Sequence, residues 1–228
     1  MLFKGIKPEG IYLLAENRFN DSKVFYDEHK PQINELVIHP LRALLDDLFD
    51  TLVEINPDFI LDPVRCISRI RRDTRYTHDK SLYRENLWMM FRHQKNYLPT
   101  PMLWFEFFPD GYNYGGGIIS ASPAFMEHWR TAIRENPENI EVAVQPALDA
   151  GFEIDGNCYK RSKAEADGIT GTAGELYNLK SPFLSVHIDT IANLNKPKKL
   201  EKQLISGYEA LTPFYDYCLK LTKSYNCE

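Results

Sequence analysis

Positive charge is concentrated in one short stretch of this chain. Between Arg65 and Arg84 the sequence holds seven basic residues and only two acidic ones, Asp73 and Asp79. The whole chain has 27 Lys and Arg residues against 32 Asp and Glu residues, a formal net charge of -5. A basic segment in an acidic protein indicates a local site rather than a general attraction to polyanions.

Arginine outnumbers lysine in this stretch, and a guanidinium can grip a phosphate or a carboxylate through two parallel hydrogen bonds. The predicted ligand-binding residues are Arg69, Arg72, Arg75 and Lys80. Asp73 can orient the arginines, and the weaker candidates for a catalytic role in proton transfer are Asp73, His78 and Tyr83. The leading hypothesis is a small-ligand binder or an enzyme whose partner is an anionic small molecule.

Two other hypotheses fit the same residues. In the first, Asp73 neutralises its arginine neighbours and the cluster is a structural ion-pair network in a non-catalytic protein. In the second, the basic segment binds nucleic acid and its aromatic neighbours stack on bases, namely Tyr76, Tyr83, Trp88 and Phe91. Nucleic acid is the less favoured partner, because most aromatic residues in strands belong to the core.

The remaining motifs give weaker signals. The glycines of "YNYGGGIIS" lack the Gly-Lys-Ser/Thr ending of a phosphate-binding loop, so they predict a bulge or a close backbone approach. If the arginine cluster lies on an adjacent strand, the same glycines leave room for a ligand. The histidines show no metal-ligand spacing, and neither a metal nor a cofactor is predicted.

The hydrophobic pattern predicts an α+β fold in one domain, because helices and strands are not interleaved as βαβ units. Its expected parts are N-terminal helices within residues 8–56, a central antiparallel sheet within 64–121, helices and a hairpin within 122–190, and a closing helix over 197–225.

Local signals refine this expectation. Asp21 is a predicted N-cap of a helical run that Pro31 and Pro40 divide or kink, and Pro213 predicts a kink or break near Leu211. Asp110-Gly111 predicts a hairpin turn. The predicted strands are "CISRI", "LWMMFRH", "MLWFEFF", "YNYGGGIIS" and "FLSVHID"; a second hairpin is expected around Asp155-Gly156 and a surface loop over "ADGITGTAGE".

The chain also carries signals about its environment. It contains no apolar run of the length that spans a bilayer, which predicts no membrane partner. Its four cysteines form no C-x-x-C pair, and they are expected to be reduced thiols. A cytoplasmic location is the expectation.

The basic stretch also resembles a known signature. Arg69-x-x-Arg72-Asp73-x-Arg75-Tyr76, followed by Asp79-Lys80-x-x-Tyr83, is similar to the motif of a widespread, mostly bacterial family of uncharacterised proteins, catalogued as a conserved domain of unknown function. Further matching positions are Asn17, Phe25, Pro40, Gly116, Gly117, Arg130 and Ile133. The resemblance implies a bacterial cytoplasmic protein and no known activity.

The chain departs from the family pattern at four positions. Tyr76 replaces a typical phenylalanine, Leu82 a proline, Arg84 a lysine, and Val24 a tryptophan. Arg71 lies outside the signature and is expected to be a surface residue.

Overall fold

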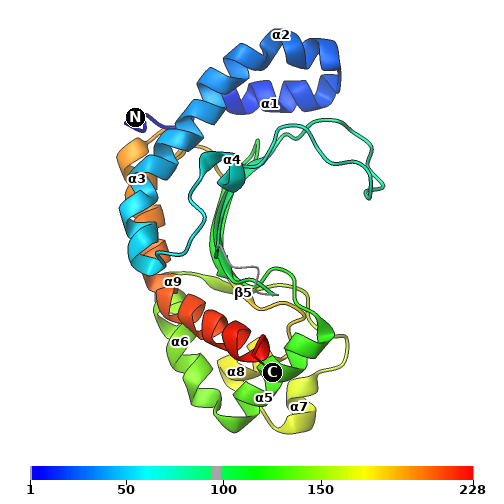
Figure 1. Ribbon diagram of the computed structural model, residues 1–228, viewed down its shortest axis with the longest axis vertical. Helices are drawn as coiled ribbons and strands as arrows, with labels where there is room; N and C mark the ends of the chain where they lie inside the picture. Colours follow the sequence, from blue (N-terminus) through cyan, green and yellow to red (C-terminus); the bar gives the residue numbers. More distant parts are fainter. Residues whose placement is uncertain (1, 94–98, 228) are drawn as a thin grey trace.

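The computed structural model describes residues 2–93 and 99–227 and shows an α+β architecture built on one antiparallel sheet. The strand order is β1-β2-β3-β5-β4. Figure 1 shows the sheet edge-on and curved, with α3 and α9 along its convex side. The strands are β1 (Leu87–Arg92), β2 (Met102–Phe107), β3 (Tyr112–Gly117), β4 (Glu153–Asp155) and β5 (Phe183–Ile188).

The N-terminal region is helical, as its apolar spacing predicts. Asp21 does not cap the second helix: its left-handed backbone, with φ of 45°, ends α1, and the Ser22 hydroxyl accepts a hydrogen bond from the backbone N–H of Phe25 instead. The elements are α1 (Pro8–Asn20), α2 (Lys23–Ile33), the π-helical η1 (Asn34–Ile38) and α3 (His39–Ile55).

Pro31 and Pro40 modify this helical run without ending it. Helical structure continues from Lys23 to Ile55, with the π-helical turn η1 between the two prolines. A π-turn is a local widening of a helix, and it stands just before Pro40, which has no N–H to donate. The prediction was two or three consecutive helices or one kinked helix. The structure has α2, η1 and α3 following one another without a gap.

The C-terminal helix α9 (Pro197–Tyr225) has the predicted bounds. Pro213 does not break it, and Figure 1 shows α9 changing direction along its length, from orange to red. Its buried side packs on the sheet, where Tyr208 Oη donates a hydrogen bond to the Trp104 carbonyl at 2.9 Å. The helix therefore covers one face of the sheet.

The two faces of the sheet differ in chemistry because side chains alternate along each strand. The face toward α9 carries Phe105, Phe107, Tyr112 and Tyr114 in paired register and is apolar. The opposite face carries polar side chains from β2, β3 and β5: Glu106, Asn113, Ser185 and His187. Gly115 also faces this side. Of the two alternatives predicted for the glycines of β3, the structure shows the close backbone approach, since a Cβ at Gly115 would clash with the Leu184 carbonyl oxygen, and the register is regular without a bulge.

The remaining helices lie below the sheet in Figure 1. Ser122 caps the first of them at the predicted place, accepting a hydrogen bond from Phe125 N at 3.1 Å. These helices are α5 (Pro123–Glu135), α6 (Pro137–Asp149), α7 (Lys163–Asp167) and α8 (Gly171–Tyr177).

Three further local predictions were wrong. "CISRI" does not form a strand, because Asp62 caps the short helix α4 (Pro63–Cys66) and Ile67 makes only an isolated bridge with Met89. The segment around Asp155-Gly156 is not a hairpin, since β4 pairs with the distant β5. "ADGITGTAGE" is not a loop: it spans the end of α7 and most of α8, whose Ala173 and Leu176 are buried in the core.

Two further findings concern the whole described chain. Within residues 2–93 and 99–227, no helix is both long enough and apolar enough to cross a bilayer. Cys66 and Cys218 are buried free thiols, and Cys158 and Cys227 are exposed free thiols.

Candidate anion-binding site

The basic stretch of the sequence forms an extended arm, here defined as residues 69–84. Its two sides run antiparallel near the sheet: Arg72 N donates to Leu82 O at 2.8 Å, and Arg84 N donates to Ile70 O at 2.9 Å. Figure 1 shows the arm extending away from the body of the protein from beside α4, below α1. Asp21 Oδ1 accepts from Leu82 N at 2.6 Å, so the end of α1 anchors the base of the arm.

Within the arm, the arginines pair with neighbouring carboxylates. Arg75 grips Asp73 through Nε at 3.0 Å and Nη2 at 2.7 Å, and these hydrogen bonds lower the pKa of Asp73 to about 2. Arg72 pairs with Asp79 and donates to Ser81 Oγ at 2.7 Å. Hydrogen bonds from Ser81, and then from Arg72, hold the pKa of Asp79 well below its ordinary value.

The other predicted site residues of the arm are spread out. Arg69 and His78 are exposed, and the Lys80 ammonium donates to the Thr74 carbonyl at 2.8 Å. Tyr83 is buried, and its ring stacks on Tyr26 at 4.8 Å between centroids. Burial raises the pKa of Tyr83. Of the predicted residues, Arg72 and Tyr83 line one small pocket at the base of the arm, together with Arg18 and Arg84. Arg75 and Lys80 do not line it: Arg75 pairs with Asp73, and Lys80 with the Thr74 carbonyl.

A second cationic cluster lies at the other end of the molecule, between α5 and the segment that leads into α7. A surface pocket of about 380 Å³ lies there, and we call it the Arg130 pocket. Its lining has five basic and two acidic side chains, a surplus of three positive charges. The lining residues are Glu127, Arg130, Arg134, Tyr159, Lys160, Arg161, Ser162, Lys163 and Asp167.

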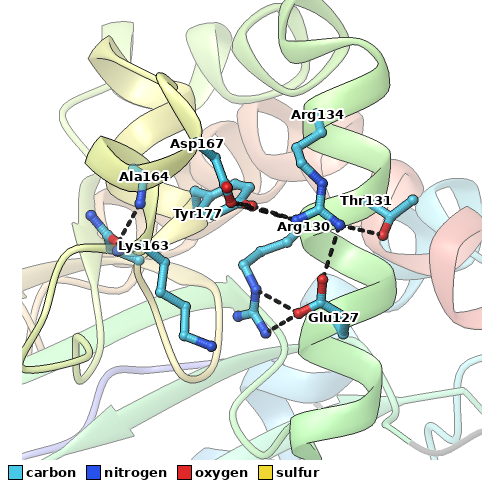
Figure 2. Close-up of polar contacts among 9 residues, drawn as sticks. Glu127, Arg130, Thr131, Arg134, Lys163, Ala164, Asp167 and Tyr177 are labelled. Atoms are coloured by element: carbon cyan, nitrogen blue, oxygen red, sulfur yellow. Dashed lines mark hydrogen bonds and ion pairs between the residues drawn. The ribbon is translucent and has the colours of Figure 1, made fainter.

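Helical spacing places the first three of these residues together, because positions three, four and seven apart share a face of α5. Arg130 donates to Glu127 Oε2 through Nε at 3.2 Å and Nη2 at 2.9 Å, and Arg134 Nη2 reaches Glu127 Oε1 at 2.9 Å (Figure 2). The hydrogen bonds from Arg134, and then from Arg130, lower the pKa of Glu127. One carboxylate therefore positions two guanidinium groups.

Arg134 is also tied to the opposite wall of the pocket. Its Nη1 donates to Tyr177 Oη at 2.6 Å and lies 3.5 Å from Asp167 Oδ2 (Figure 2). Tyr177 donates its own proton to Asp167, and burial, followed by this bond, raises the pKa of Tyr177. This chain fixes α7 and α8 against α5.

Arg130 differs from Arg134 in having an unused donor. Its side chain is 3% exposed, and its Nη1 has no hydrogen-bond partner. A buried guanidinium with an unsatisfied N–H costs free energy, and a single half-exposed carboxylate compensates for little of its lost hydration. The pocket is therefore electrostatically incomplete in the structure.

Further cations gather around the ring of Tyr159. The Lys163 ammonium lies 4.5 Å from the ring centroid, the Arg130 guanidinium carbon 5.6 Å and the Lys180 ammonium 5.8 Å. Figure 2 shows the Lys163 side chain extending toward the guanidinium of Arg130. Three positive groups around one ring repel one another, and an anion between them would relieve that repulsion.

The sequence profile of one protein family covers most of this chain. The family is described as a conserved hypothetical protein (DUF2461), and the match runs over residues 10–217. The chain belongs to the DUF2461 family. Neither a curated protein nor a solved structure matches it significantly.

The DUF2461 match includes both cationic clusters, the arm and the Arg130 pocket. Sequence reasoning singled out the arm because its charges are contiguous. It did not assemble the Arg130 pocket, although Arg130 was noted as a position of the resemblance. Two signals were present: Glu127, Arg130 and Arg134 share one helical face, and Lys160, Arg161 and Lys163 follow within one short segment.

The described part of this DUF2461 chain offers no obvious metal site. In residues 2–93 and 99–227, no group of three His, Cys, Asp or Glu side chains is arranged to hold a metal ion.

Proposed function

We propose that this protein binds a small anionic ligand, a phosphate or a carboxylate, in the Arg130 pocket. The observation that carries the proposal is the Arg130 guanidinium, which is buried, oriented by Glu127 and left with a free Nη1. A bound oxyanion would neutralise part of the positive surplus, and a small movement of the Arg130 side chain would bring the covered Nη1 to it as a donor.

The surrounding residues suit this role. Lys163 has a flexible ammonium next to the Tyr159 ring, and Ser162 lines the same pocket with a hydroxyl. Glu127 and Asp167 hold the arginines in place without cancelling their charge. Fixed donors of this kind lower the entropic cost of gripping a ligand.

Ligand binding can be measured by thermal unfolding and calorimetry in low-salt buffer, with inorganic phosphate, phosphorylated sugars and succinate as probes. A ligand that binds only the folded state raises the unfolding temperature progressively with its concentration. We expect this rise in the unmodified protein and its loss in Lys163→Gln and Arg130→Met. Lys163→Gln guards against the case in which Arg130→Met fails to fold.

The arm supplies the matched control and the rival site. Arg75→Gln removes an equal charge from the other cluster and should leave the anion effect unchanged. An anion effect that survives both pocket variants but disappears in Arg75→Gln or Arg72→Gln would assign binding to the arm, as the signature Arg69, Arg72, Arg75 and Lys80 suggests. The absence of any stabilisation would reject the Arg130 pocket as well.

A purely structural role is the main alternative for both clusters. It makes a different prediction for the protein without ligand. If Arg130 is structural, Arg130→Met should lower the free energy of unfolding, whereas removal of an incompletely paired buried charge should leave stability unchanged or increase it.

Nucleic-acid binding is the second candidate function, supported by Tyr76, which is 89% exposed on the arm beside Arg75. Binding through the arm to a single-stranded oligonucleotide should weaken steeply as salt rises. A flat binding curve at low salt would remove this candidate.

A further inference from the structure

A pocket lined by acidic rather than basic side chains lies on the face of the sheet turned away from α9. It has a volume of about 200 Å³ and we call it the sheet-face pocket. Two carboxylates, an imidazole, an amide and a hydroxyl line it together with two aromatic rings and one isoleucine. The residues are Trp104, Glu106, Asn113, Ile119, Asp155, Phe183, Ser185 and His187.

Glu106 is the unusual group in this pocket. Burial raises the pKa of its carboxyl group, although hydrogen bonds from Asn86 and Asn113 oppose the shift. The bond from Asn86 Nδ2 to Glu106 Oε1 is 2.5 Å long. Among the described residues, no Lys or Arg side chain forms an ion pair with Glu106. Its hydrogen-bond donors are neutral amides, and Arg84 and His187 act on its charge only from beyond ion-pair distance. A desolvated carboxylate held in this way gains from a cationic partner.

Asp155 provides a second, fixed negative charge. Its Oδ2 accepts from Ser185 Oγ at 2.8 Å and contacts His187 Nε2 at 3.2 Å, and its Oδ1 accepts from Gly156 N at 2.6 Å. Burial favours a higher pKa for Asp155, but the bonds from Ser185 and His187 outweigh it and keep the pKa below its ordinary value. Asp155 already accepts three hydrogen bonds, so Glu106 has more acceptor capacity left for a ligand.

The Ser185, His187 and Asp155 side chains do not form a nucleophilic triad. A triad needs the carboxylate on one imidazole nitrogen and the serine on the other. Here His187 Nε2 lies near both Ser185 Oγ, at 3.1 Å, and Asp155 Oδ2. Ser185 is 2% exposed and donates its proton to Asp155, so the cluster favours recognition over attack on a substrate.

The aromatic walls complete the pocket. Trp104 packs edge-on against Phe183, with 5.6 Å between ring centroids, and its Nε1 donates to Asn113 Oδ1 at 3.0 Å. Tryptophan is the side chain that best attracts a cation through its ring face. We propose that the sheet-face pocket binds the protonated amine of a small ligand, with Glu106 as its direct partner and Asp155 as a supporting charge.

The proposal can be tested with n-propylammonium as the probe and 1-propanol as an uncharged molecule of matched size. The readout is the indole N–H resonance of Trp104 in a two-dimensional NMR spectrum, assigned by its disappearance in Trp104→Phe. We expect n-propylammonium to shift this resonance in a saturable manner and 1-propanol to leave it unchanged.

Two variants locate the effect. Glu106→Gln keeps the shape of the side chain and should weaken the binding of n-propylammonium by about tenfold or more. Ile119→Arg places a cation on an exposed residue at the pocket and should also weaken it, and this variant keeps the test valid if Glu106→Gln unfolds. Glu209→Gln, on the exposed side of α9, should change nothing.

Several outcomes would overturn the proposal. They are an equal response to 1-propanol, the absence of any shift with n-propylammonium, or an amine effect undiminished in Ile119→Arg and in a folded Glu106→Gln. The inference does not depend on the Arg130 pocket, because Lys163→Gln should remove the phosphate effect and leave the n-propylammonium shift intact.

Discussion

Asn56 Nδ2 donates a hydrogen bond to Tyr215 Oη at 2.7 Å, which joins the end of α3 to the middle of α9. Both residues are buried, and Asn56 also arranges the turn after α3 by accepting from Asp58 N at 2.9 Å. The N-terminal helices and the C-terminal helix are therefore connected by a polar contact inside the core.

Tyr215→Phe should lower the free energy of unfolding by about 1–3 kcal/mol, because it leaves the buried Asn56 amide without its acceptor. Tyr217→Phe on the same helix is the matched control, since the Tyr217 hydroxyl is buried and has no partner in the described structure. That change should be neutral or stabilising. Urea denaturation followed by circular dichroism measures both, and equal losses in the two variants would contradict the role given to Asn56.

The ion pair at the arm should persist to low pH. The pKa of Asp73 is depressed from 3.8 to about 2 by Arg75, so its contribution is complete above about pH 4 and is lost as the pH falls through about 2. A carboxyl-carbon NMR titration should give a midpoint near 2 for Asp73. In Arg75→Gln the midpoint should return toward 3.8. An unshifted midpoint in the unmodified protein would show that the arm is unpaired in solution.

The sheet should not tolerate a side chain at Gly115, which pairs with the pocket residues Trp104 and Ser185. A Cβ there would clash with the Leu184 carbonyl oxygen and with the Trp104 ring, at a cost of about 1–3 kcal/mol in Gly115→Ala. Trp104 fluorescence should change as well. Gly151→Ala is a useful comparison, since Gly151 has φ of 88° and no atom within 4 Å of an added Cβ. It should cost backbone strain alone and leave Trp104 unaffected.

Long periodic segments were predictable from sequence because their apolar stripes repeat over many turns. The bounds of α9 and the Asp110-Gly111 connection between β2 and β3 follow from local spacing and turn chemistry. Local propensity failed where tertiary partners decide the outcome. β4 is only three residues long and exists because β5 lies beside it, and α8 forms despite its glycines because Leu176 and Tyr177 reach the core.

The candidate sites show the same contrast. The contiguous charges of the arm were visible in the sequence, and pairing of Asp73 with neighbouring arginines was one of its hypotheses. That Asp73 pairs with Arg75 in particular depends on the fold of the arm. The sheet-face pocket joins Glu106 of β2 to Asp155 of β4 and His187 of β5, three positions that no linear spacing relates. The sequence shows that His187 is present, but only the order of the strands in the sheet shows that it lies near Asp155 and Glu106.

The segment from Asp155 to Tyr159 belongs to both pockets, since Asp155 lines the acidic one and Tyr159 the basic one. Four residues of chain span at most about 14 Å, so the Cα atoms of Asp155 and Tyr159, one from the lining of each pocket, lie within that distance. Along this short segment the lining of the surface changes from acidic at Asp155 to basic around Tyr159. Under the two binding proposals, a molecule that contacts both pockets would place its positive end at the acidic one and its negative end at the basic one, because the reverse orientation brings like charges together.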